Sequence, residues 1–238
     1  MQNLFENWRR FLSEEEEGLP FLNEGSEVLK QKYIDQIKAR IPDEEVTALL
    51  NILEPVMNSK KYAHSVRVAA MTTELPSSTK DMILGALFHD YVERIPGCVD
   101  DPKHPCLGDL PISDLSKKYI SALSSAEKNK KDKKVNQPLE HIKAELEKVS
   151  DDKTLKNTLI LIKISDRMDN LRSRSKSGGV SKSYLRKSID LIADLKKLYT
   201  AEGGDAQNIE ILLAALKKKL LKKINKGVEK KTADRRRK

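Results

Sequence analysis

Cysteine, aromatic residues and long apolar runs are all scarce in this chain of 238 residues. The two cysteines, Cys98 and Cys106, lie eight residues apart in a stretch rich in proline, glycine and aspartate. A zinc site needs more ligands at closer spacing, although His104 lies between the two thiols. We therefore expect two unpaired cytosolic thiols rather than a zinc site.

No apolar run approaches the roughly 20 residues that a helix needs to span a bilayer. The N-terminus carries Arg9 and Arg10 but continues into the acidic run from Glu14 to Glu17. Because it has neither a long apolar run nor a small-residue cleavage site, it is not typical of a secretory signal. The sequence predicts no transmembrane segment and a cytoplasmic location.

The composition predicts an ordered centre with polar ends, because apolar residues make up only 38% of the chain and charged residues 34%. The net charge of +9 is unevenly distributed. Residues 212–238 contain twelve Lys or Arg and two acidic residues, so the rest of the chain is nearly neutral. We expect an aromatic and acidic segment at 1–18, a main domain at 20–205, and a basic helix with a disordered tail at 206–238.

The hydrophobic pattern is helical throughout and shows no period-2 runs, which predicts an all-α bundle. A helix start is expected at Asp43, and a loop at 95–111. Helices are expected within residues 20–57, from the start of the His64 segment to Leu75, from Lys80 to Arg94, from Asp114 to Ser125, from Pro138 to Val149, from Leu155 to Ile164, from Tyr184 to Tyr199, and from Ile209 to Ile224.

Both ends of the chain carry candidate interaction surfaces. Near the N-terminus, which resembles the N-termini of phage and marine viral proteins, an apolar face is formed by Leu4, Phe5, Trp8 and Phe11. This face either packs on the core or docks in the groove of a partner. The basic tail either keeps the protein soluble or contacts a polyanion, which would be nucleic acid or an acidic membrane.

Three separated stretches supply metal-ligand types in the order His, His-Asp, Asp. His64 precedes the doublet His89-Asp90 by 25 residues, and Asp166 follows the doublet by 76. Two neutral imidazoles and two carboxylates leave coordination positions open for water and a phosphate oxygen. The mixed set favours manganese or a similar divalent ion over a closed structural zinc site.

That order and spacing resembles the HD-domain metal-dependent phosphohydrolases. Residues 162–173, IKISDRMDNLRS, resemble the string K-[IL]-[AS]-D-R-x-x-N-x-R-[TS] of the Rel/SpoT-type alarmone hydrolases within that superfamily. The resemblance covers roughly residues 30–200. It implies an all-α HD domain that uses Mn²⁺ to hydrolyse the 3′-pyrophosphate of ppGpp or a related nucleotide in the stringent response of a bacterium or of its phage-infected host.

The resemblance also implies roles for individual residues. The metal would be held by His64, His89, Asp90 and Asp166. Glu93, which is expected to lie on the same helical face as the doublet, would act with Asp90 in catalysis by orienting or deprotonating water. Substrate would contact Asn170, Ser173, Lys163, Arg167 and Lys61. Arg94 occupies the position of the family's second carboxylate.

Two other functions fit the sequence. One is an HD phosphohydrolase that acts on another nucleotide, such as a nucleoside 5′-monophosphate, since the family's guanine-side motif upstream of His64 is missing. The other is a nucleotide-binding or interaction protein with weakened catalysis, because Arg94 cannot serve as a base.

Overall fold

The computed structural model describes residues 27–95, 98, 105–124, 142, 146–147, 152–176 and 182–212. All regular secondary structure within these residues is helical, which confirms the predicted all-α fold. Several predicted features lie outside them: the apolar face with Leu4, Phe5, Trp8 and Phe11, most of the helix from Pro138 to Val149, and the tail beyond residue 212.

The N-terminal half of the fold begins with α2 (Glu27–Lys38), α3 (Asp43–Leu53) and α4 (Ser59–Thr73). The predicted start at Asp43 is confirmed, and three acidic residues occupy the first turn of α3, where they complement the helix dipole. Asn58 caps α4, because its side chain accepts a hydrogen bond from the backbone N–H of Lys61. This cap sets the start of the helix that carries His64.

The next segment contains α5 (Lys80–Leu87), the 3₁₀ turns η1 (Val92–Arg94) and η2 (Pro105–Leu107), and α6 (Asp114–Ser124). Thr79 caps α5 by accepting a hydrogen bond from the backbone N–H of Met82. The prediction of one helix from Lys80 to Arg94 is wrong, because α5 ends at Leu87 and the chain turns before η1. The His-Asp doublet therefore lies in the turn.

The C-terminal half contains α8 (Lys153–Lys176), α9 (Lys182–Ala201) and a helical segment at 206–212. The predicted helix from Leu155 to Ile164 is confirmed, but it does not end near Asp166. It continues for ten residues beyond Asp166, because Met168 and Leu171 keep an apolar stripe against the core. Asp166 thus projects from the middle of a long helix.

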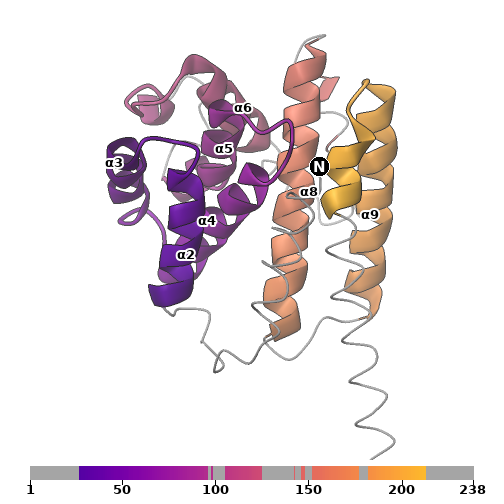
Figure 1. The fold of residues 1–238 in the computed structure, drawn as a ribbon, viewed down its shortest axis with the longest axis horizontal. Coiled ribbons are helices and arrows are strands. Elements are labelled where there is room, and N and C mark those ends of the chain that lie inside the picture. The colour runs from indigo at the N-terminus through magenta and orange to yellow at the C-terminus, as the bar shows by residue number, and fades with distance from the viewer. Residues whose placement is uncertain are drawn as a thin grey trace, which may run out of the picture.

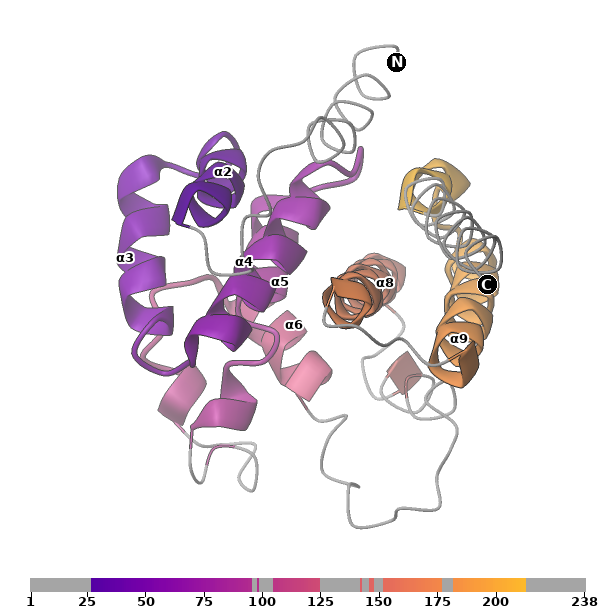
Figure 2. The same ribbon diagram turned by 90° about the horizontal axis from the view of Figure 1, so that it is seen from below.

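Helix α8 lies between a group formed by α2 to α6 and the helix α9 (Figures 1 and 2). Helix α4 packs against α2, α5 and α8, so it lies at the centre of the larger group. The core is continuous, because buried apolar side chains of both halves and of α8 form one cluster. This arrangement places the polar residues of α4, the turn after α5, and α8 side by side.

The two cysteines correct a prediction. Cys98 and Cys106 form a disulfide with their Cα atoms 6.2 Å apart, so the expectation of two unpaired thiols is wrong. Cys106 lies in η2 and pairs with the buried Cys98, which lies three residues after Ile95. A spacing of eight residues in a loop does not reveal this approach.

Among the described residues, no helix combines the length and the apolar character that crossing a bilayer requires. The predicted cytoplasmic location stays a prediction.

Candidate metal centre

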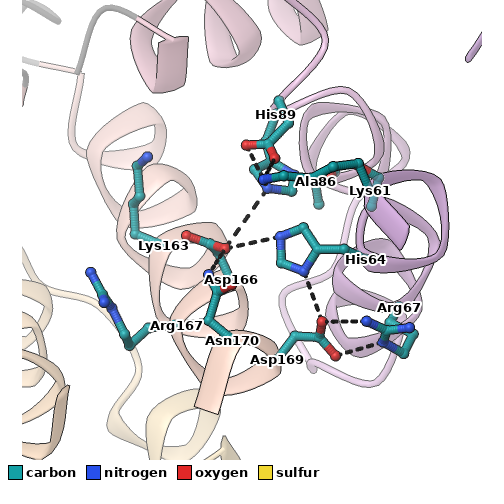
Figure 3. Close-up of polar contacts among 12 residues, drawn as sticks. Lys61, His64, Arg67, Ala86, His89, Lys163, Asp166, Arg167, Asp169 and Asn170 are labelled. Carbon is teal, nitrogen blue, oxygen red and sulfur yellow. Dashed lines mark hydrogen bonds and ion pairs between the residues drawn. The ribbon is translucent and has the colours of Figure 1, made fainter. Parts of the chain in front are cut away.

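Four predicted ligands from three segments converge at one place, and Figure 3 labels three of them, His64, His89 and Asp166. His64 comes from α4, His89 and Asp90 from the turn after α5, and Asp166 from α8. His64 Nε2 lies 3.1 Å from Asp166 Oδ1, and His89 Nε2 lies 3.9 Å from the same oxygen. Ligand atoms of His64, His89 and Asp90 lie within 4.8 Å of one another, a grouping that could hold a metal ion.

The His89 ring is oriented for a cation. Its Nδ1 lies 2.7 Å from the carbonyl oxygen of Ala86, and since a carbonyl only accepts, Nδ1 carries the proton. The lone pair of Nε2 then points into the centre, where Nε2 is buried and makes no hydrogen bond. It lies 3.2 Å from Asp90 Oδ1. A lone pair facing a carboxylate oxygen is repulsive unless a cation lies between them, so the residues present fit a metal ion.

Both carboxylates of the centre are held by neighbouring polar groups. Asp90 Oδ2 pairs with Lys61 Nζ at 2.8 Å, which leaves Oδ1 facing His89. Asn170 Nδ2 donates to Asp166 Oδ1 at 2.6 Å, one helical turn along α8. Such partners fix the orientation of ligands before a metal binds.

The protonation states also favour a metal centre. Burial by itself would raise the pKa of Asp90, but neighbouring charges, among them the Lys61 ammonium that donates to Oδ2, hold that pKa well below its usual range. Burial opposes ionisation of Asp166 in the same way, and the hydrogen bond with His64 lowers its pKa nevertheless. Burial lowers the pKa of His89. The centre therefore offers two carboxylates and a neutral imidazole at neutral pH.

His64 differs from His89, because carboxylates face both of its ring nitrogens. Burial lowers the pKa of His64, but its hydrogen bonds with Asp166 and Asp169 outweigh burial and raise the pKa to about 9. Its Nδ1 lies 2.7 Å from Asp169 Oδ2. Asp169 also pairs with Arg67, which lies one turn after His64 on α4.

Asp169 and Arg67 were not among the predicted site residues. Both follow a predicted ligand by three residues on the same helix: Arg67 follows His64, and Asp169 follows Asp166. Residues three apart share a helix face. That spacing makes both residues candidates, but it does not show that they lie against His64.

The predicted substrate-binding residues fall into two groups. Lys61 and Asn170 lie beside the centre, where each contacts a carboxylate ligand. Lys163 and Arg167 lie on α8 as well, but Lys163 Nζ donates to the carbonyl of Leu123 at 3.4 Å. Arg167 extends away from His64 and donates to the Tyr184 hydroxyl of α9 at 3.2 Å (Figure 3). Ser173 is on α8, and its side chain lies outside the described residues.

Glu93 and Arg94 both belong to η1, directly after the doublet. Glu93 is half-buried and Arg94 is exposed. The predicted sharing of one α-helical face by His89, Asp90 and Glu93 is wrong, because α5 ends before all three.

No family model, curated protein or solved structure matches this chain.

Proposed function

We propose that the chain is a metal-dependent phosphohydrolase of the HD type, acting on the 3′-pyrophosphate of guanosine tetraphosphate or a related alarmone. One observation carries the proposal: two histidines and two aspartates from three separate segments converge around the buried, unbonded Nε2 of His89. The resemblance of residues 162–173 to the alarmone hydrolase string supplies the substrate class.

The ligand set proposed for a divalent ion, with manganese as the first candidate, is His64, His89, Asp90 and Asp166. A divalent ion bound there would make water a nucleophile at neutral pH and would polarise the phosphate oxygen that it contacts. The chain itself prepares the site, because Lys61 and Asn170 orient the two carboxylates while their other oxygens or lone pairs stay available.

The remaining roles are those that the resemblance to the alarmone hydrolases implies. Glu93 in η1 would orient or deprotonate the attacking water. Lys61, whose side chain is 38% exposed and pairs with Asp90, would bind a substrate phosphate. Asn170 and Ser173 would position the nucleotide from α8. Lys163 and Arg167, which have protein partners in the structure, would contact phosphate only after giving these up.

The test is hydrolysis of ppGpp, ppApp and several nucleoside 5′-monophosphates by the purified protein with Mn²⁺. We expect pyrophosphate release from an alarmone and its loss in Asp166→Ala. Asp194→Ala is the matched control, because Asp194 lies on α9 and pairs only with a surface lysine in the described contacts. Full activity in Asp166→Ala would refute the proposed centre. Turnover of the monophosphates alone would show that the substrate is another nucleotide and not an alarmone.

A second candidate function is nucleotide binding without efficient turnover. The observation that favours it is Arg94, exposed in η1 at the position of the family's second carboxylate. A guanidinium cannot accept a proton at neutral pH. This candidate predicts nucleotide binding without product, and it predicts that Arg94→Asp raises turnover. An inactive Arg94→Asp variant that still binds metal and nucleotide would show that the missing acid is not the reason.

A further inference from the structure

Asp169 is a fully buried carboxylate that lies directly behind His64 (Figure 3). Its Oδ2 is 2.7 Å from His64 Nδ1, on the side of the ring away from Asp166. Arg67 pairs with both of its oxygens, through Nε to Oδ1 at 2.8 Å and through the guanidinium Nη2 to Oδ2 at 2.9 Å. Burying a carboxylate is costly unless a cation compensates its charge, and Arg67 supplies that cation.

The contact with Asp169 decides which nitrogen of His64 carries the proton when a metal is present. An ionised carboxylate only accepts hydrogen bonds, so Nδ1 must donate. A neutral imidazole with its proton on Nδ1 has its lone pair on Nε2. Nε2 faces Asp166 and the centre, which is where a ligand lone pair is needed.

Arg67 explains why Asp169 stays behind the ring instead of becoming a ligand itself. The two guanidinium contacts occupy both carboxylate oxygens in a bidentate pair, which fixes the plane of the carboxylate. The side chain of Arg67 is only 11% exposed, so the pair is shielded from water. The guanidinium also balances the charge of Asp169, so the centre does not gain a further negative ligand.

We propose that Asp169, held by Arg67, is a positioning residue that fixes the Nδ1–H tautomer and the ring orientation of His64 and so tunes metal affinity. The inference rests on the metal centre of the proposed function. It adds two residues to that centre, Asp169 and Arg67, which would act on the metal only through His64.

The test is a double-mutant cycle read out as Mn²⁺ affinity, measured from the electron paramagnetic resonance signal of free Mn²⁺. Asp169→Asn keeps the shape but gives the side chain an N–H₂ group, which favours a lone pair on Nδ1 and a proton on Nε2. We expect Asp169→Asn to weaken Mn²⁺ binding by about 10–100-fold. In a His64→Ala background the same change should alter affinity by less than about twofold, because the residue through which Asp169 acts is gone.

Asp81→Asn is the control for the loss of a carboxylate that accepts hydrogen bonds within the fold. Asp81 accepts hydrogen bonds from the hydroxyls of Ser113 and Ser116 at the start of α6, away from the centre. This variant is expected to lose stability without losing Mn²⁺ affinity. Equal losses of affinity in Asp169→Asn with and without His64 would show a merely structural role and would overturn the proposal.

A second measurement needs no variant, and so holds if Asp169→Asn fails to fold. In wild-type protein labelled with ¹⁵N-histidine and loaded with diamagnetic Zn²⁺, nitrogen shifts should show His64 protonated at Nδ1 and bound to the ion through Nε2. The opposite assignment overturns the proposal. Failure of the proposed metal centre can be distinguished from failure of this inference alone. In the first case wild-type protein would bind no Mn²⁺, or His64→Ala would leave the Mn²⁺ affinity unchanged. Either result would overturn this inference as well.

Discussion

The ring of His64 has Asp166 Oδ1 3.1 Å from Nε2 and Asp169 Oδ2 2.7 Å from Nδ1. In the metal-free protein both nitrogens donate, and the pKa of His64 is raised to about 9 because these carboxylates outweigh burial. A metal ion can bind Nε2 only after that proton leaves. His89 does not have to lose a proton before a metal binds, because burial lowers its pKa.

This protonation pattern predicts that Mn²⁺ binding releases about one proton between pH 7 and 8.5, so affinity rises by about tenfold per pH unit there. The stability of the metal-free protein runs the other way. His64 has a folded pKa above its unfolded one, so its stabilising contribution is full below pH 6.5 and is lost as the pH rises through about 9.

Isothermal titration of the metal-free protein with Mn²⁺, in two buffers with different ionisation enthalpies, measures this proton release. If the His64→Ala variant still binds Mn²⁺, its binding should release almost no proton. A pH-independent affinity in the wild-type protein would contradict the prediction and would mean that His64 enters the metal-bound state still protonated or does not act as a ligand.

At the residue scale, sequence order was enough to name His64, His89, Asp90 and Asp166 as a group that the structure does bring together. It was not enough for Asp169. An aspartate three residues after a ligand is common on helix surfaces, and only the packing of α8 on α4 shows that this one is fully buried against an imidazole. Burial depends on the tertiary contact, which a local pattern does not contain.

Among the helices, α5 and α6 approach so closely that one position has no room for a side chain. A Cβ placed on Gly85 would lie 2.9 Å from the Cβ of Tyr119 and 3.4 Å from Ile162 Cδ1. The Cβ of Tyr119 is fixed to its backbone, so it cannot move away alone. Gly85 thus sets the distance between α5 and α6, and α5 leads directly into the His-Asp turn.

Gly85→Ala is therefore expected to destabilise the protein although alanine is the better helix former. Overpacking costs about 1–3 kcal/mol, and the gain in helix propensity offsets about 1 kcal/mol of it. The net loss should appear in urea unfolding as a lower midpoint with an unchanged slope.

Replacing a glycine by alanine at an exposed helix position raises the stability of a protein. A higher stability of Gly85→Ala would therefore show that α5 and α6 are not in close contact. A displaced α5 should also shift His89, so we expect weaker Mn²⁺ binding along with the lower stability.

The end of α5 shows what the helical pattern could not predict. Residues 80–94 keep an amphipathic pattern, which predicted one helix. In the structure the backbone carbonyl of Ala86 accepts from the His89 ring at 2.7 Å, and the chain leaves the helix at Phe88. A side chain that captures a backbone carbonyl competes with the helical hydrogen bond from the residue four positions later. Such local competition is invisible to periodicity, which is why the helix was predicted too long.

Across the whole molecule, the candidate centre joins parts of the chain that are distant in sequence. His64 belongs to the helices of the first half, and Asp166 to α8, which lies between that group and α9 (Figure 1). In the metal-free protein the lone pair of His89 faces a carboxylate oxygen of Asp90 there, and the two repel each other. A divalent ion shared among the four residues replaces that repulsion with attraction and ties α8 to α4 and the turn after α5.

Metal removal should therefore lower the stability of the whole fold. An ion that binds only the folded state at 100 times its dissociation constant stabilises it by about 2.7 kcal/mol. For a domain of this size each kcal/mol shifts Tm by roughly 2–4 °C, so Mn²⁺ should raise Tm by about 5–10 °C over the EDTA-treated protein. Asp166→Ala should lose most of this shift, whereas Asp194→Ala should keep it. If the wild-type protein and Asp166→Ala shift equally with Mn²⁺, the ion binds elsewhere, and the convergence of the four residues would then serve the packing of α8 alone.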